Sequence, residues 1–416
     1  EDLLLPCCCF LLKASLLLVM IADEISHIEA GQKIQIGDGD DGKETALLIA
    51  RENRTEIERA LQESPPGQRK SMHWIVMGMP DRDLQTLSAE FLLKNHRFAH
   101  EAIGSAPWAD TVPEEVFWEG ILPYAVVDER RDDWRASFRD LFLPLVTEAE
   151  TTGEAAVILN QRIFPMLGVK YSTQRPKANQ SGLESIDAGI ASCTGLSVLL
   201  IEACRSVGVP ARFVGVPLWA DGSGNHSWIE VWDNGRWRFT GAAEPTGLEL
   251  DKGWFTDRAA DAVIDDSRRA VWATSWNRPD RRNSRHAHYP MVWSPEDTSV
   301  SAINVTNRYT RNRVILPDGF GRLYVRITEG GDDDQQRISL PAVLIVDGQE
   351  VARGDTRDPQ ADANDHLEFQ APFGVDVTVR FELPKEPFEV TERFLRDEQL
   401  IDASIPSRSR RSPSDY

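Results

Sequence analysis

The chain has 416 residues, of which 41% are hydrophobic and 27% are charged, so it is long enough to form two or three domains with buried cores. Its formal net charge is −20 at pH 7. Such an acidic chain is a poor partner for nucleic acid or for an anionic membrane surface, and we exclude both as the main partner. The acidic residues are spread along the sequence, which is typical of a solvated surface rather than a dedicated binding patch.

The first 22 residues have an unusual composition. Leu3 to Ala22 are almost continuously apolar, but Lys13 lies near the centre, where a charge is costly in a membrane span. We interpret residues 1–40 as a leader or export segment, which predicts a periplasmic or extracellular location, or a cytoplasmic one if the segment is not native. Membrane association is expected only through this segment. Three of the five cysteines lie in it, and the two that remain exclude a disulfide framework.

Residues 41–149 are predicted to form a helical region. Apolar residues recur at helical spacing over four stretches, 44–63, 83–103, 114–124 and 132–148. His96 and His100 stand at i and i+4 in the second stretch, close enough to share a metal ion. The sequence NHRFAH lacks the glutamate that a zinc-protease helix places beside its first histidine. We therefore predict no metal site and interpret the two histidines as part of a helix surface.

The most informative stretch begins at Ala191 with ASCTGLSVLLIEACRSVGVPAR. Cys193 stands at the head of an amphipathic run, and Gly208 and Pro210 end it, which predicts a helix with a thiol at its N-terminus. Unpaired N–H groups and the positive end of the helix dipole stabilise an anion there, so Cys193 is a candidate nucleophile. Cys204 lies eleven residues further along at an apolar position, and we assign it to the core.

Three strands are predicted after this helix. The first is ARFVGVPL, from Ala211, and the second is HSWIEVW, which begins at His226. Asp-Asn-Gly then predicts a hairpin turn into a third strand around Trp237 and Phe239. A cysteine on a helix followed by a histidine on a strand is an arrangement in which imidazole can take the thiol proton or stabilise the thiolate.

These features together resemble the transglutaminase-like superfamily, which is related to papain and uses a Cys, His, Asp triad. The resemblance rests on Cys193 before Thr194 and Gly195, on CRSVGVPARFVG, and on HSWIEV with the strand that follows it. It covers roughly residues 150 to 260. It implies attack of a thiol on an amide carbonyl, an acyl-enzyme, and transfer to water or an amine.

The third triad residue departs from the family pattern. The family acid usually follows the tryptophan of the third strand by four residues, and that position is Gly241 here. The nearest acid beyond it is Glu244, in GAAEP, which we predict to orient the histidine. Glu230, Asp233 and Asp251 are the alternatives. A displaced acid predicts a weaker enzyme rather than an inactive one, because the nucleophile, base and oxyanion donors supply much of the catalysis.

The resemblance also implies an oxyanion donor and walls for the site. One donor would be the N–H of the cysteine and another an upstream side-chain amide, for which Gln180 is preferred over Gln174. For each glutamine, an ordinary surface-loop role is favoured over a role as oxyanion donor, because loops are commonly polar without catalytic duty. Trp219 and Asn225 flank the histidine in sequence and could line the site, although Trp219 could also belong to the core.

From Arg313 the sequence contains short runs in which apolar and polar residues alternate, LYVRI, VLIVDGQEVA, HLEFQA and VTVRFEL. Asp-Gly in the second run predicts a hairpin. We predict a β-sandwich over residues 312–386, resembling the immunoglobulin-like accessory domains of exported enzymes. The tail, residues 387–416, ends in SIPSRSRRSPSDY and is predicted to be partly disordered.

The sequence therefore predicts an α+β protein with a helical N-terminal region, a papain-like core over residues 150–290 and a C-terminal β-sandwich. The predicted activity is hydrolysis or acyl transfer at amide bonds of peptides or proteins, with Cys193, His226 and Glu244 as the catalytic residues. No metal or organic cofactor is predicted. Two alternatives are an inactive transglutaminase-like binding or scaffold protein and an amidase of the peptide:N-glycanase type. The oligomeric state, the substrate, and the choice between hydrolysis and transfer stay open.

Overall fold

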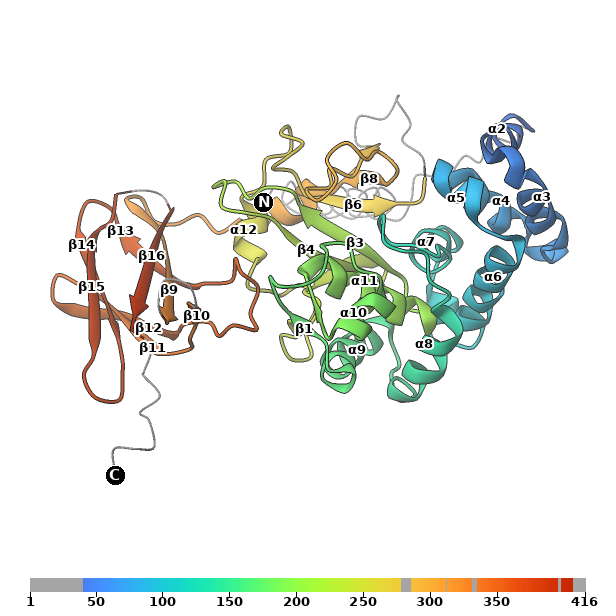
Figure 1. The fold of residues 1–416 in the computed structure, drawn as a ribbon. Helices are drawn as coiled ribbons and strands as arrows, with labels where there is room; N and C mark the ends of the chain where they lie inside the picture. The colour runs from blue at the N-terminus through green and yellow to red at the C-terminus, as the bar shows by residue number, and fades with distance from the viewer. Residues whose placement is uncertain (1–39, 278–285, 312, 331–334, 396–397, 407–416) are drawn as a thin grey trace, which may run out of the picture.

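A computed structural model describes residues 40–277, 286–311, 313–330, 335–395 and 398–406 (Figure 1). The predicted leader and the low-complexity end of the tail lie outside these residues. Within them, no helix has the length and apolar composition needed to cross a membrane. A helical region, a central sheet with helices, and a pair of C-terminal sheets follow one another along the chain and across the molecule. The predicted α+β class is confirmed.

The helical region packs its apolar faces into one cluster that includes Ile57, Leu92 and Trp118. The long helix predicted over 44–63 is interrupted at Arg51, where φ is +51°. The helix predicted over 83–103 is interrupted because the Ser88 side chain accepts a hydrogen bond from the N–H of Phe91 and starts a new helix. The α-helices are α2 (Asp40–Ala50), α3 (Arg54–Glu63), α4 (Arg69–Gly78), α5 (Asp81–Thr86), α6 (Ala89–Gly104), α7 (Glu114–Gly120) and α8 (Arg135–Phe142).

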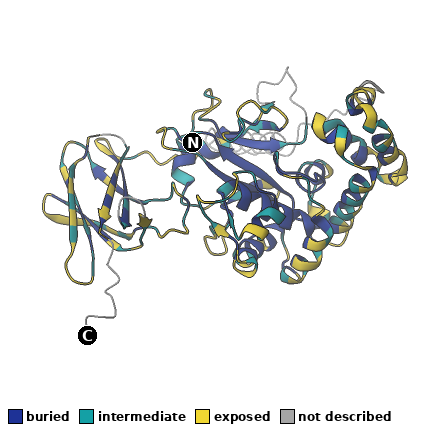
Figure 2. Cartoon of the chain, in the orientation of Figure 1, coloured by how far each residue is buried: buried dark blue, intermediate teal, exposed yellow. Residues whose placement is uncertain are grey.

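The centre of the molecule is an antiparallel sheet of six strands in the order β5-β4-β3-β6-β8-β7. Its strands are β3 (Ala211–Val216), β4 (His226–Asp233), β5 (Arg236–Thr240), β6 (Trp272–Ser275), β7 (His286–His288) and β8 (Ser301–Asn304). The helices of this part are α9 (Thr152–Leu167), α10 (Gly182–Ala188), α11 (Cys193–Ser206), α12 (Thr256–Ala260) and α13 (Thr306–Thr310), with the short parallel pair β1 (Lys170–Tyr171) and β2 (Ile190–Ala191). Figure 2 shows that α11 and the sheet beside it are among the most buried elements.

The central part extends beyond the predicted boundary at residue 290. Strand β8 pairs with both β6 and β7, and α13 follows it directly. Val305 and Tyr309 pack into the same apolar cluster as Trp228 and Phe255. The boundary predicted from composition was placed too early, because the turn-rich sequence before residue 290 connects two strands of one sheet rather than two domains.

The C-terminal strands form two four-stranded sheets that share one apolar cluster, with Leu323 and Ile401 from one sheet and Leu344 and Val379 from the other. The first sheet contains β9 (Phe320–Glu329), β10 (Gln336–Arg337), β13 (Leu367–Pro372) and β16 (Glu398–Ile405), and the second contains β11 (Pro341–Val346), β12 (Gln349–Asp355), β14 (Asp376–Phe381) and β15 (Phe388–Arg393). The boundary predicted at 386 is wrong, because β15 pairs with β14 and β16 pairs with β9. The alternating burial of residues 400–405 is the period-two signal that marks β16.

Candidate active site

The local sequence places the thiol of Cys193 at the first position of α11. Ser192 caps this helix, because its side chain accepts a hydrogen bond of 3.1 Å from the N–H of Gly195. Gly195 lies in a tight space, since a Cβ there would be 3.1 Å from that of Ala191 and would require a small shift of its neighbours. Cys193 is half-buried, whereas Cys204 is fully buried and burial raises the pKa of its thiol to about 12. The prediction that Cys204 belongs to the core is confirmed.

The imidazole of His226 faces the thiol from the first residue of β4. A contact of 3.2 Å between the hydroxyls of Thr194 and Ser227 joins the start of α11 to the start of β4. The imidazole is 1% exposed and packs against aromatic rings. Their centroids lie 4.7 Å (Trp254), 5.0 Å (Phe255), 5.9 Å (Trp228) and 6.3 Å (Trp219) from the centroid of the imidazole. These contacts fix the ring plane, so that its two nitrogens point in defined directions.

Each ring nitrogen of His226 faces a carboxylate. Oε2 of Glu244 lies 3.5 Å from Nε2, and Oδ2 of Asp362 lies 3.5 Å from Nδ1. Burial alone lowers the pKa of His226, but the charges of Glu244 and Asp362 outweigh it and hold the pKa well above its ordinary value. The imidazolium is therefore the favoured form in this site. An imidazolium is the partner that a neighbouring thiolate requires.

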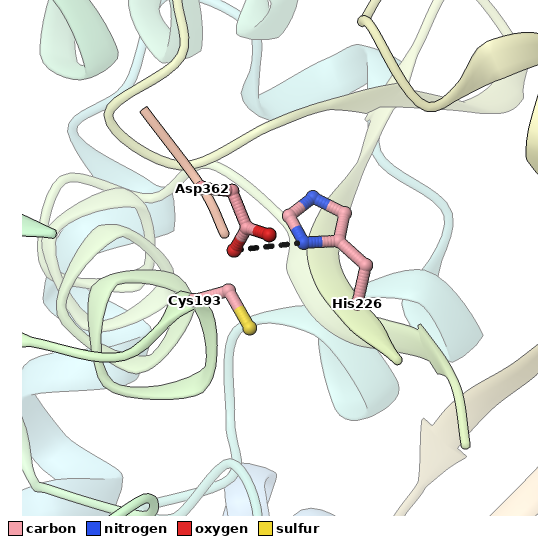
Figure 3. Close-up of side chains that lie close together, drawn as sticks. All are labelled: Cys193, His226 and Asp362. Atoms are coloured by element: carbon pink, nitrogen blue, oxygen red, sulfur yellow. Dashed lines mark ion pairs between the residues drawn. The ribbon is translucent and has the colours of Figure 1, made fainter. Parts of the chain in front are cut away.

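Cys193, His226 and Asp362 come from three separate segments of the chain and lie close together (Figure 3). One donor atom from each of the three side chains lies within 4.8 Å of the other two. Asp362 comes from the connection between β12 and β13, in the C-terminal sheets, 136 positions after the histidine. Burial raises the pKa of its carboxyl, but His226 and hydrogen bonds from Asn364 hold that pKa below its ordinary value. Sequence analysis missed this residue, because a single aspartate in a polar loop carries no signal of a distant partner.

Gly241, at the position where the family has its acid, leaves space for the carboxylate of Glu244. A Cβ on Gly241 would lie 2.2 Å from Oε2 of Glu244. The chain turns back between these residues through Ala243, whose φ is +63°. Asn160 holds this turn, since its side chain donates to the carbonyl of Gly241 at 2.8 Å and accepts from the N–H of Ala243 at 2.9 Å. The carboxylate therefore reaches the histidine from a position three residues later in the sequence.

The alternative acids lie in other networks. Glu230 is paired with two arginines, Arg212 and Arg308. Asp233 accepts hydrogen bonds from the start of α9, at Thr152 and Gly153. Asp251 accepts hydrogen bonds from Arg236 and Arg238 and from the backbone of β5. None of the three is among the carboxylates paired with His226 in the described part of the chain.

The two predicted oxyanion glutamines differ in their surroundings. Gln180 is 1% exposed, and its side-chain N–H groups donate to the carbonyls of Glu184 and Ile190 at 3.3 and 3.1 Å. Its amide donors are thus engaged with backbone, so it is neither a surface residue nor a free oxyanion donor in this structure. Gln174 is exposed in the loop after β1. The N–H of Cys193 remains a candidate donor, because the first N–H groups of a helix have no intrahelical acceptor.

The two residues predicted to flank the histidine lie beside it in different ways. The ring of Trp219 is buried and stacks on His226 and on Trp228, with interplanar angles of 27° and 5°. Trp219 therefore belongs to the core and also forms a wall of the site. Asn225 is half-buried, and its carbonyl accepts a hydrogen bond of 2.9 Å from the side chain of Asn364. This contact brings the C-terminal loop against the site.

His96 and His100 are not a histidine pair on an exposed helix surface. Both contact the hydroxyl of Ser71, at 2.8 and 3.0 Å, and burial lowers the pKa of each to about 4. The interpretation as surface residues is wrong for His96, which is 1% exposed. Within residues 40–277, 286–311, 313–330, 335–395 and 398–406, the cluster with metal-ligand geometry is that of Cys193, His226 and Asp362.

Comparison with protein families found a match within the chain. Residues 140–241 match the model of the transglutaminase-like superfamily. The chain contains a transglutaminase-like core. The family resemblance predicted from the sequence is confirmed. The matched range contains α9, α11 and strands β3, β4 and β5, which carry the thiol and the histidine.

A solved structure named "Putative Cysteine Protease" from Cytophaga hutchinsonii, at 1.9 Å, is also similar to part of this chain. The two are 20% identical, with a TM-score of 0.25. The alignment covers 31% of this chain and 44% of the other, so it spans less than half of that structure. No match was found among curated proteins.

Proposed function

We propose that this protein is a thiol enzyme that acts on amide bonds of peptides or proteins through an acyl-enzyme on Cys193. The observation that carries the proposal is the half-buried thiol at the N-terminus of α11, opposite an imidazole whose far nitrogen faces Glu244 at 3.5 Å. A nucleophile, a base and an orienting group in this order are the components of a catalytic triad. The match to the transglutaminase-like superfamily supports the same reaction class.

The chemistry follows from the positions of the three side chains. The thiolate of Cys193 attacks the amide carbonyl carbon, and the negative charge that develops on the carbonyl oxygen faces the free N–H groups at the start of α11. The imidazolium of His226 donates a proton to the leaving amine as the carbon–nitrogen bond breaks. Neutral His226 then removes a proton from water, or from an acceptor amine, which attacks the thioester and releases Cys193. Glu244 holds Nε2 and stabilises the imidazolium throughout.

The first test is the rate at which iodoacetamide alkylates Cys193 in the full chain at pH 7, with labelling resolved by peptide mass spectrometry. We expect rapid labelling of Cys193 and slow labelling of Cys204, which is the matched control on the same helix. In the variant His226→Ala, labelling of Cys193 should slow because the imidazolium that pairs with the thiolate is absent. Equal rates in both proteins would overturn the proposed Cys–His pair.

The second test separates the possible reactions. The protein is incubated with a peptide library, with a glutamine peptide plus a primary amine, and with an N-glycosylated peptide. Peptide cleavage indicates hydrolysis, amine incorporation indicates acyl transfer, and release of the glycan indicates the peptide:N-glycanase type. Each activity should be lost in Cys193→Ser and kept in Cys204→Ser. A reactive Cys193 with none of these activities would favour a binding or scaffold protein.

A further inference from the structure

The loop that connects β12 and β13 carries a carboxylate with an unused oxygen. Asp362 is 2% exposed, and its Oδ1 accepts hydrogen bonds from the N–H and the side chain of Asn364 at 2.9 and 3.0 Å. Among the described residues, its Oδ2 has no hydrogen-bond partner. This oxygen is aimed at Nδ1 of His226, 3.5 Å away. The 3.5 Å ion pair with His226 is too long for a hydrogen bond, so this buried oxygen still has the capacity to accept a further ligand.

The histidine and the cysteine complete a set of three ligands. Within the described part of the chain, neither ring nitrogen of His226 has a hydrogen-bond partner, although the ring is 1% exposed. The sulfur of Cys193, one nitrogen of His226 and one oxygen of Asp362 lie within 4.8 Å of one another. Figure 3 shows the carboxylate of Asp362 facing the imidazole of His226, with Cys193 beside both. We propose that Cys193, His226 and Asp362 form a binding site for a zinc ion.

The donor set and its dimensions suit zinc. Zinc binds thiolate sulfur at about 2.3 Å and imidazole nitrogen or carboxylate oxygen at about 2.0 Å, usually in a tetrahedron. These bond lengths place the nitrogen and oxygen ligands about 3.3 Å apart and the sulfur about 3.5 Å from each of them. The Nδ1 to Oδ2 distance of 3.5 Å already matches. The sulfur needs a shift of about 1 Å, which rotation of a half-buried side chain can supply.

The surroundings of the three ligands resemble the support that metal sites usually have. Nε2 of His226, the nitrogen opposite the metal, faces Glu244, and a carboxylate in this position orients a ligating histidine. Three hydrogen bonds join the loop that carries Asp362 to the central part of the molecule. The N–H of Ala363 donates to the Tyr171 hydroxyl at 3.1 Å, Asn364 donates to the Asn225 carbonyl at 2.9 Å, and Arg258 donates to the Asn364 carbonyl at 3.3 Å.

Zinc in this site would have two consequences. It would occupy the thiolate of Cys193 and so block attack on an amide, which makes the ion an inhibitor of the proposed enzyme. It would also fasten the C-terminal sheets to the central part, because the ligands come from both. The first consequence rests on the proposed function, whereas zinc binding itself does not.

The test is a titration of the metal-free full chain with zinc alone, in competition with a chromophoric chelator. The cysteines at positions 7–9 could also bind zinc, so the titration is run with these three changed to Ser. We expect one zinc per chain, and loss of this site in Asp362→Asn and in Cys193→Ser. Asp362→Asn keeps the Oδ1 acceptor that orders the loop but replaces the ligating oxygen. Glu244→Gln should weaken binding by about 10-fold to 100-fold, the effect of losing a supporting carboxylate.

Cobalt provides a second readout that needs no substrate. Co²⁺ alone should give a thiolate-to-cobalt charge-transfer band and the strong visible bands of a tetrahedral site, and both should be absent in Cys193→Ser. Cys204→Ser is the matched thiol control and Asp365→Asn, in the same loop, the matched carboxylate control, and both should bind normally. Zinc affinity in Asp362→Asn equal to that of the parent, or no zinc bound by the parent, would overturn the proposed site.

Thiol reactivity links the site to the proposed function. Zinc should slow alkylation of Cys193 in the parent protein, chelation should restore it, and Asp362→Asn should remain reactive when zinc is added. If zinc binds and Cys193 is protected but no amide-bond activity is found, the metal site stands and the proposed enzyme fails. If activity is found and zinc has no effect on it, the proposed enzyme stands and the metal site fails.

Discussion

Glu230 is predicted to stabilise the fold rather than to take part in catalysis. It lies four residues after His226 on β4 and is fully buried. One oxygen accepts from Arg212 at 2.9 and 2.6 Å, and the other accepts from Arg308 at 2.5 Å and from Tyr309 at 2.9 Å. Burial alone raises the pKa of Glu230, but Arg308 and Arg212 outweigh it and lower the pKa from 4.5 to about 2.

The expected cost of Glu230→Gln follows from this environment. The difference between 4.5 and about 2 corresponds to about 3 kcal/mol, at about 1.4 kcal/mol for each tenfold change in proton affinity. Removing one member of a buried ion pair costs about 3–5 kcal/mol, which agrees. Because the folded-state pKa is depressed, the stabilisation is fully present above pH 4.5 and is lost as the pH falls toward about 2.

The assay is urea unfolding at pH 7, followed by tryptophan fluorescence. Glu230→Gln should lower the free energy of unfolding by about 3 kcal/mol. The exposed Glu249→Gln, whose parent residue pairs with Lys252, should change it by less than about 0.5 kcal/mol. Folded Glu230→Gln should still show alkylation of Cys193 that depends on His226. Unchanged stability together with slow alkylation would refute the reasoning and would make Glu230 the orienting acid.

Three further changes test other parts of the structure. Glu244→Gln should reduce kcat of the amide reaction by about 10²-fold to 10⁴-fold, because an orienting acid acts through His226. The unfolding midpoint should stay near that of the parent protein. A kcat equal to that of the parent would contradict this role. Arg205→Met should lower the free energy of unfolding, measured in urea, by about 3–5 kcal/mol, since the buried guanidinium of Arg205 donates to the carbonyls of four residues. A decrease of less than about 1 kcal/mol would be inconsistent with those hydrogen bonds. Burial and the nearby Asp221 raise the pKa of Glu398 from 4.5 to about 7, so the native state holds this proton more tightly and stability falls as the pH rises across that interval. Glu398→Gln should therefore reduce the difference between unfolding midpoints at pH 5 and pH 8, and an undiminished difference would argue against the assignment.

The central helix and the strands after it could be predicted from sequence because their signals are local. Helical periodicity that begins at a Ser-Cys step and ends at Gly-Val-Pro predicted α11, which runs from Cys193 to Ser206. The Asp-Gly hairpin between β11 and β12 was equally readable, since Asp347 and Gly348 both adopt the positive φ angles that such a turn requires. The boundaries of the central part and of the C-terminal sheets could not be predicted as well from sequence. Pairing of β8 with β6 and of β16 with β9 depends on hydrogen bonds between segments far apart in the chain.

The candidate site divides in the same way. The sequence by itself determined the thiol at a helix start, the histidine at a strand start and an acid in the turn after the third strand, because each is marked by neighbouring residues. Only the tertiary structure decided that Glu244 fills the space left by Gly241 and that the side-chain amide of Gln180 donates to backbone carbonyls. The tertiary structure alone also decided that Asp362 reaches the histidine from the C-terminal sheets. The physical reason is that these features are contacts between segments distant in the sequence, and local sequence patterns carry no information about which distant segments come together.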